Sequence, residues 1–378
     1  MRSGKTDDVI IVGGGIVGMA VARNAAHRGL RVRVLDRDRP GAGATGAAAG
    51  LLSPLSETSE AGPFLDAGLA SLRLYPAWVE HLRGETDVDP WFRPDGKVRV
   101  ARHPAARAGL AALEARAAAF GLGVHRLAHA DLAERLGVEP GTEPASFEGA
   151  LFLEEDHQVD SRRLHRALTE AARRAGVEIV SDTPVRGLEF EGDRTVGVRV
   201  DGGQLAAGAV VLAAGARSGQ MEGLPFPLPV RPVRGQMLAL EAGSALPDRV
   251  LESEDVYLVP RGDGRLLVGA TVEEAGFQEV CTPEARAWLL EAAGALLPRL
   301  RSAPVLDQWC GLRPGTPDLH PILGAAPGVR DLYLGTGHYR NGVLLAPWTA
   351  EALGCLLAGE AGPEIPDAFL PHRFHPVA

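Results

Sequence analysis

The chain has 378 residues, of which 46% are hydrophobic, and a formal net charge of -9. This length allows two domains, or one large domain with a smaller lobe. The acidic balance disfavours nucleic acid as a partner, and no apolar run is long enough to span a bilayer. Three scattered cysteines form no C-x-x-C motif and no even framework. We therefore expect a cytoplasmic protein that contacts no membrane.

The first 35 residues predict one complete βαβ unit. A β-branched strand at 8–13 precedes a helix over 15–28, and a second strand at 31–35 ends at Asp36. Further helices are expected over 64–82, 104–120, 159–175, 282–297 and 343–357. Further strands are expected at 177–180, as three short runs within 183–207, and at 209–214, 230–240, 256–260, 265–269 and 332–334.

The βαβ material opens the chain, recurs in the middle and returns at the end, with antiparallel strands between. This pattern predicts an α/β fold (α+β overall), with a Rossmann-like cofactor-binding domain and an interleaved antiparallel-sheet substrate domain. We expect residues 1–85, 150–228 and 308–378 to form the discontinuous cofactor domain. Residues 86–149 and 229–307 are then expected to form the substrate domain.

Gly13, Gly15 and Gly18 form a G-x-G-x-x-G motif between the first strand and the first helix. Such glycines allow a tight turn, close approach of the backbone to a pyrophosphate and close packing of the helix. Asp36 follows at about the ~20 residues at which a carboxylate accepts hydrogen bonds from the adenosine ribose. An acid at this position disfavours the 2′-phosphate of NADP. The motif predicts a dinucleotide but does not separate NAD from FAD.

Two later segments favour FAD over NAD. Residues 40–50 (PGAGATGAAAG) form a loop of small residues suited to a second backbone contact with the diphosphate. Residues 210–215 (VVLAAG) resemble the strand-to-turn signature of FAD proteins, although any buried strand ending in a glycine turn has this pattern. In combination the two segments indicate FAD.

Two arginine-bearing segments near the C-terminus point to a substrate. Residues 309–318 (WCGLRPGTPD) present Arg313 between turn residues, where its planar fork suits a substrate carboxylate. Residues 335–342 (GTGHYRNG) place glycines ahead of an apolar helical run, so that helix amides can face a cofactor. For Arg340, a structural salt bridge and a ligand contact both remain open. Other chemistries lack support: only Lys5 and Lys97 could form a Schiff base, and no metal-binding motif is present.

The chain resembles the glycine oxidases, members of the D-amino-acid oxidase family of flavoproteins. The resemblance lies in the order of the glycine motif with Asp36, the small-residue loop, the two arginine-bearing segments and two further segments. The additional segments are 257–261 (YLVPR) and 269–271 (GAT), and the resemblance runs from about residue 8 to about residue 358. It implies FAD-dependent oxidation of glycine by O2 to the imine or glyoxylate with hydrogen peroxide, in thiamine (thiazole) biosynthesis. Alternatives are an oxidase of sarcosine or D-amino acids, an NAD-dependent dehydrogenase, or a non-catalytic flavin-binding protein.

The resemblance also implies roles for individual residues. Arg313 would bind the substrate carboxylate, Tyr257 would cover the substrate, and Arg340 would lie near the substrate and the flavin edge. The implied cofactor residues are Gly13, Gly15, Ile16, Val17, Gly18, Asp36, Arg37, Ala44, Thr45, Ala49, Gly50, Leu51, Val185, Ala214, Gly215, Gly337, His338, Arg340, Asn341, Gly342 and Val343.

Two positions qualify this assignment. Gly311 occupies the site where sarcosine oxidases carry their flavin-linking cysteine, so we expect noncovalent FAD. In the family that the chain resembles, the position two residues before the tyrosine corresponding to Tyr257 is often histidine, whereas here it is Asp255. This difference leaves the preferred amine substrate open. We also expect a homo-oligomer.

Overall fold

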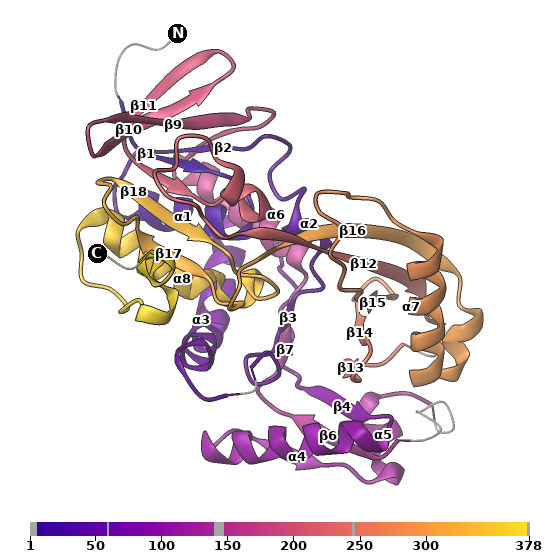
Figure 1. Ribbon diagram of the computed structural model, residues 1–378. Helices are drawn as coiled ribbons and strands as arrows, with labels where there is room; N and C mark the ends of the chain where they lie inside the picture. The colour runs from indigo at the N-terminus through magenta and orange to yellow at the C-terminus, as the bar shows by residue number, and fades with distance from the viewer. Residues whose placement is uncertain (1–5, 59, 140–146, 244–245, 376–378) are drawn as a thin grey trace.

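The computed structural model describes residues 6–58, 60–139, 147–243 and 246–375. Two eight-stranded sheets carry the fold. A small sheet of β3 (Leu51–Leu52) and β7 (His157–Gln158) lies between the first sheet and the outer part of the second, as Figure 1 shows.

The first sheet has a parallel centre in the order β18–β11–β1–β2–β8. Strand β17 is antiparallel at one edge, and the β9–β10 hairpin pairs with β11. The strands are β1 (Asp7–Val12), β2 (Val32–Leu35), β8 (Glu178–Val180), β9 (Val185–Glu191), β10 (Arg194–Val200), β11 (Gly203–Leu212), β17 (Ile322–Ala325) and β18 (Leu332–Thr336). Ile10 and Ile11 point to opposite faces of β1 and are both fully buried, as expected for a parallel sheet covered on both sides.

The second sheet runs in the order β16–β12–β15–β14–β13–β4–β6–β5, and only its β13–β4 pair is parallel. Its strands are β4 (Lys97–Ala101), β5 (Val124–Arg126), β6 (Gly149–Leu153), β12 (Arg231–Glu241), β13 (Val250–Glu252), β14 (Tyr257–Pro260), β15 (Arg265–Gly269) and β16 (Val305–Gly315). Its core includes Leu238 and Val268 from the strands and Leu289 from helix α7 (Pro283–Leu296).

Helices cover these sheets. Figure 1 places α1 and α8 with the first sheet, α7 beside the second sheet, and α4 and α5 beside β4 and β6. The remaining helices are α1 (Ile16–His27), α2 (Ala44–Ala47), α3 (Pro63–Thr86), α4 (Pro104–Ala119), α5 (His129–Leu136), α6 (Ser161–Arg174) and α8 (Gly342–Ala358). Short 3-10 turns are η1 (Gly215–Gln220), η3 (Pro298–Ser302), η4 (Asp367–Phe369) and η5 (Pro371–Phe374). Within the described residues, no helix combines the length and apolar character needed to cross a membrane.

The expected combination of a Rossmann-like sheet and an antiparallel sheet is confirmed, and every expected helix is present. Two expectations were wrong. The third short run before Ala207 and the strand expected at 209–214 are one strand, β11, because Gly208 lets the chain pass close to the backbone of Asp8 without a turn. Residues 309–315, expected between turns, belong to the long strand β16, which pairs along β12.

The domain division remains a prediction, and two strands lie across its boundaries. Strand β6 begins before residue 150 and belongs to the second sheet, although 150–228 was expected in the cofactor domain. Strand β16 likewise belongs to the second sheet, although 308–378 was expected in the cofactor domain. Both strands were hard to place because pairing with distant strands, rather than a local turn signal, sets their sheet.

Candidate active site

The turn between β1 and α1 brings backbone segments into close contact. Gly13 has φ +108°, and a Cβ at this position would overlap the carbonyl oxygen of Ala213, just after β11. A Cβ at Gly18 would overlap the carbonyl oxygen of Gly13. The motif glycines therefore allow strand and helix to pack around a turn that is open to a ligand.

Asp36 is fixed at the end of β2. Its Oδ2 accepts a hydrogen bond from the amide of Gly14 (2.7 Å), and its Oδ1 accepts one from the amide of Asp38 (2.9 Å). These bonds hold the carboxylate beside the glycine turn. The structure thus brings together the two parts of the dinucleotide motif.

The short helix α2 connects this turn with the second sheet. Thr45 Oγ1 accepts a hydrogen bond from the amide of Ile16, the first residue of α1 (2.9 Å). At the other end of α2, the carbonyl of Ala47 accepts a hydrogen bond from Trp309 Nε1 on β16 (3.1 Å). A Cβ at Gly311 would overlap the side chain of Ala47, so β16 lies directly against α2.

Two cavities meet at α2, because Ala44 lines both of them. The first has a volume of about 520 Å³. Of the expected cofactor residues it is lined by Gly13, Gly15, Asp36, Arg37, Ala44, Thr45, Val185, Ala214 and Gly215. The second has a volume of about 250 Å³. Of the expected site residues it is lined by Ala44, Ala49, Gly50, Leu51, Tyr257, Arg313, Arg340, Asn341 and Val343.

The other expected cofactor residues line neither cavity: Ile16, Val17, Gly18, Gly337, His338 and Gly342. His338 is only 3% exposed, and its Nε2 lies 3.2 Å from Thr349 Oγ1. Burial lowers the pKa of His338 to about 4, so its imidazole is neutral near pH 7. These positions support the backbone around the cavities rather than form their walls.

Arg313 lies on β16 with its side chain in the second cavity. Its Nη1 donates to the carbonyls of Arg234 (3.3 Å) and Thr271 (3.1 Å). A Cβ at Gly235, which pairs with Gly311 across β12 and β16, would overlap the guanidinium, so this glycine makes room for it. Among the described residues, no carboxylate lies within ion-pair distance of Arg313, whereas Arg234 contacts Glu273 at 2.5 Å. The Arg313 fork is therefore anchored by neutral carbonyls and available to an anion.

Tyr257 and Arg340 face the same cavity. The Tyr257 hydroxyl lies 3.8 Å from Met237 Sδ, and burial raises the pKa of this phenol, which remains a neutral donor near pH 7. The Arg340 guanidinium lies 5.2 Å from the centre of the Tyr339 ring. Burial works against its charge, but the attraction of Glu57 together with the effects of Tyr339 and Tyr257 outweighs burial, and the pKa of Arg340 is raised. No described carboxylate is close enough for an ion pair with Arg340, which disfavours a structural salt bridge.

Sequence reasoning did not place Glu57, Lys97 and Glu252 in the site, although all three line the second cavity. Glu57 follows β3, Lys97 begins β4 and Glu252 ends β13. They come from three separate segments and no motif surrounds them. Nothing in the sequence alone could have brought them together.

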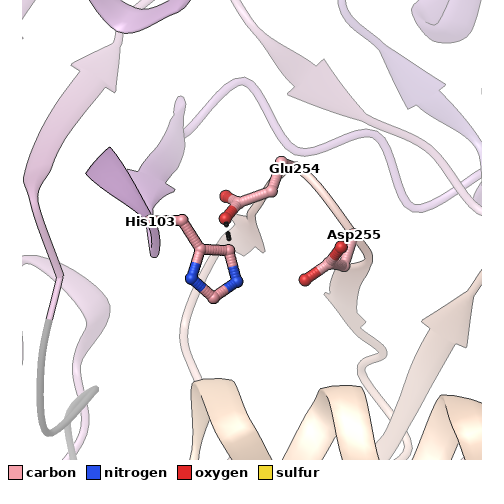
Figure 2. Close-up of side chains that lie close together, drawn as sticks. All are labelled: His103, Glu254 and Asp255. Atoms are coloured by element: carbon pink, nitrogen blue, oxygen red, sulfur yellow. Dashed lines mark ion pairs between the residues drawn. The ribbon is translucent and has the colours of Figure 1, made fainter. Parts of the chain in front are cut away.

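Asp255, the departure noted in the sequence, lies at the rim of this cavity and is exposed. Its Oδ2 lies 3.4 Å from Arg102 Nη1. Figure 2 shows Asp255 beside Glu254 and His103, and ligand atoms of these three side chains lie within 4.8 Å of one another. All three are exposed, and the 3.7 Å ion pair of His103 with Glu254 is that of a solvated surface group. We assign no metal to this cluster.

The two cavities share Ala44 and together suit a dinucleotide that extends from the glycine turn toward Arg313. A Cβ at Gly13, Gly50 or Gly311 would overlap neighbouring protein atoms, so these glycines allow the segments around the two cavities to pack closely. The arginine fork in the second cavity adds a position for an anionic substrate. Together these features indicate a dinucleotide-dependent enzyme with a place for an anionic substrate.

The chain belongs to the family of FAD dependent oxidoreductases (DAO), whose model matches residues 8–356. Its cofactor is FAD and it is an oxidoreductase. The residues of the first cavity would hold the adenosine and diphosphate, and Ala44 to Leu51 with Asn341 and Val343 would hold the flavin ring.

Individual relatives are similar over nearly the whole chain. The bifunctional protein ThiO/ThiG of Synechocystis sp. is 38% identical over 98% of this chain, which covers 54% of that protein. The glycine oxidase of Pseudomonas aeruginosa is 34% identical over 94% of this chain and 95% of its own length. The crystal structure of glycine oxidase from Geobacillus kaustophilus matches with a TM-score of 0.90 and 32% identity, covering 97% of this chain and 98% of that one. The chain thus spans about half the length of the bifunctional relatives.

Proposed function

We propose that the chain oxidises a small amino acid, with glycine as the first candidate, to the corresponding imine. The observation that carries the proposal is Arg313, a guanidinium in the cavity with no described carboxylate within ion-pair distance. A cation placed in this way is costly unless a ligand supplies the counter-charge. The glycine oxidases among the relatives give the first candidate for that ligand.

The substrate carboxylate would bind to Nη2 and Nε of Arg313, because Nη1 is already bonded to two carbonyls. Tyr257 would donate its hydroxyl hydrogen to the same carboxylate. Arg340 would lie over the other edge of the substrate, close to the flavin. A carboxylate held at two points in this way fixes the α-carbon in one orientation, which converts binding energy into alignment for the reaction.

FAD, held by the residues of the two cavities, would supply an acceptor for the hydride of the substrate α-carbon, and O2 would take up the electrons to give hydrogen peroxide. The chain's own residues bind the carboxylate, orient the α-carbon and exclude water. The substrate must react as the free amine, since hydride leaves as the nitrogen lone pair forms the imine bond. His338 is no base for this step, because it lies outside the cavity.

The imine would either leave for thiazole assembly or hydrolyse to glyoxylate and ammonia. The thiazole role is supported by the similarity to the ThiO/ThiG proteins. Sarcosine or a small D-amino acid remains the alternative substrate within the family. We further propose a cytoplasmic location, which is consistent with three free cysteines in the described part of the chain. We also propose that the protein forms a homo-oligomer.

The direct test is anaerobic mixing of the purified yellow protein with glycine, sarcosine, D-alanine and D-proline in separate experiments. Loss of the flavin absorbance near its visible maximum on adding an amino acid, and its return with peroxide on adding air, supports the proposal. Absence of bleaching with every member of the panel would leave a flavin-binding protein without this activity.

The flavin is proposed to be noncovalent. Gly311, which lines the cavity, has no side chain that could link to it, and the neighbouring Cys310 is not among the lining residues. Acid precipitation should release all the yellow colour into the supernatant. Colour retained in the protein pellet would show a covalent bond instead.

A further inference from the structure

Lys97 is the most deeply buried charge beside the second cavity, with 1% exposure. Its Nζ lies 2.7 Å from Asp156 Oδ2, 2.5 Å from Glu252 Oε2, 2.9 Å from Ser56 Oγ and 3.1 Å from Ser53 Oγ. These partners come from the segment after β3, the turn between β6 and β7, and the end of β13. One ammonium therefore joins three segments, two of which line the cavity, at Ser53 and at Glu252.

Both Lys97 and Glu252 are charged. Burial works against the Lys97 ammonium, but Asp156 and Glu252 outweigh it and raise the pKa of Lys97. Burial also works against the Glu252 carboxylate, but Lys97 and Arg99 outweigh it and lower the pKa of Glu252. The Lys97–Glu252 contact is an ion pair rather than an aligned hydrogen bond, since Oε2 has no hydrogen-bond partner in the described part of the chain.

Two carboxylates face one ammonium in this cluster. The remaining counter-charges are Arg99, whose Nη1 lies 3.4 Å from Glu252 Oε1 and whose side chain is 26% exposed, and Arg340, whose charge acts on both Glu252 and Glu57. Glu57 lines the same cavity. Burial raises the pKa of Glu57, the charge of Arg340 works against this, and the charge of Glu252 adds to it, so that the pKa stays raised. A second carboxylate of a substrate, placed on this wall, would therefore lie beside the ionised carboxylate of Glu252 and beside Glu57, whose carboxyl group resists ionisation.

The cavity thus presents two kinds of polar group. Arg313, Arg340 and Tyr257 offer cations and a hydroxyl donor, whereas Glu57 and Glu252 offer carboxyl oxygens. The exposed acids of the rim, drawn in Figure 2, extend the same sign of charge outward. Because buried charges are screened less than exposed ones, Glu252 should act more strongly on a ligand than the rim does.

We propose that Glu252, held in place by Lys97, determines specificity by restricting the cavity to amines with one carboxylate and with a neutral or cationic substituent. Dicarboxylic amines such as iminodiacetate and D-glutamate are excluded, and substituents ending in an amide or ammonium are accepted beside Glu252 and Glu57. This inference rests on the proposed function, because it uses the carboxylate position at Arg313 to orient the substrate.

The test compares substrates that differ in terminal charge at similar length. One series is iminodiacetate, N-ethylglycine and N-(2-aminoethyl)glycine, and the other is D-glutamate, D-glutamine and D-lysine. The FAD-loaded protein is tested with both series, and the result is read from the series whose members are oxidised. In that series we expect kcat/KM of the neutral and cationic members to exceed kcat/KM of the anionic member at least tenfold. Equal values across the charges, in protein that oxidises glycine, would overturn the inference while leaving the proposed function intact.

Glu252→Gln supplies the second measurement, because it removes the charge and keeps the shape. We expect Glu252→Gln to reduce the ratio of kcat/KM for the neutral member to kcat/KM for the anionic member at least fivefold, with bound flavin retained. Glu57→Gln serves if Glu252→Gln fails to fold. The matched control is Glu170→Gln on α6, a surface residue that pairs with Arg174 at 2.9 Å and should leave the charge preference unchanged. An unchanged preference in both cavity variants would refute the role of this wall.

Binding provides a readout independent of turnover. Perturbation of the flavin absorbance by acetate, malonate and β-alanine gives dissociation constants without oxidation. Malonate should bind at least tenfold more weakly than acetate to the wild type, and less so to Glu252→Gln. If glycine is not oxidised at all, the proposed function fails, yet these constants still test the wall: equal affinity for malonate and acetate would overturn it.

Discussion

Replacing Arg313 by alanine should leave FAD bound but remove most of the catalytic efficiency toward a carboxylate substrate. Nη1 is held by the carbonyls of Arg234 and Thr271, so two donors, Nη2 and Nε, remain for the carboxylate. Each charge-assisted bond contributes about 1.5–3 kcal/mol, and two therefore contribute about 3–6 kcal/mol. This corresponds to a loss of roughly 10²- to 10⁴-fold in kcat/KM. Arg313→Lys keeps the charge but not the fork, and should recover only part of the loss.

The assay is peroxide release with glycine, measured beside the visible flavin spectrum of each variant. Arg265→Ala is the control: this arginine lies on β15 of the same sheet, pairs with Asp263 at 2.7 Å and lines neither cavity. It should retain activity within about twofold, since exposed ion pairs contribute about 0–1 kcal/mol. An Arg313→Ala protein that keeps its flavin and oxidises glycine as fast as the control would refute the clamp.

Three further predictions concern the cofactor site and its support. Gly13→Ala should reduce FAD occupancy strongly, because the new Cβ would overlap the backbone after β11; an unchanged flavin-to-protein absorbance ratio would contradict this. Asp36→Ala should weaken FAD binding by about 1–3 kcal/mol, measured by titrating the stripped protein, and equal affinity would show that this carboxylate does not contact the ribose. The pKa of His338 is about 4 in the folded chain and 6.5 when the imidazole is exposed in the unfolded chain. Between these pH values the unfolded chain therefore binds one more proton than the folded chain. The free energy of unfolding should therefore fall as pH decreases from about 6.5 to about 4, by at most about 3 kcal/mol, and urea titrations of His338→Gln should lose this dependence.

The sequence predicted those parts of the fold that depend on local pattern. The strand, glycine turn and helix at the N-terminus carry their own periodicity and conformational demands. The same holds for the β14–β15 hairpin, whose turn residues 261–264 stand between two apolar runs. Strand β16 was missed because its pairing with β12 is long-range, and prolines and glycines near Arg313 conceal the extended pattern.

The candidate site divides in the same way. Arg313 was identified because glycine and proline surround it in a compact segment. Glu57, Lys97 and Glu252 were not, because each is an isolated charge in its own segment and only the second sheet assembles them. A buried lysine also looks like any surface lysine in a sequence, since nothing local reports the 1% exposure that gives Lys97 its effect.

The contacts of α2 give the two ligands a thermodynamic connection. This single turn of helix is bonded to α1 through Thr45 and to β16 through Ala47, so the chain that approaches the diphosphate also braces the strand that presents Arg313. A cofactor that orders α2 should therefore improve the alignment of the arginine fork. Coupling between two binding events is reciprocal, so a bound carboxylate should in turn strengthen the binding of FAD. FAD binding would then increase the affinity of the protein for its substrate.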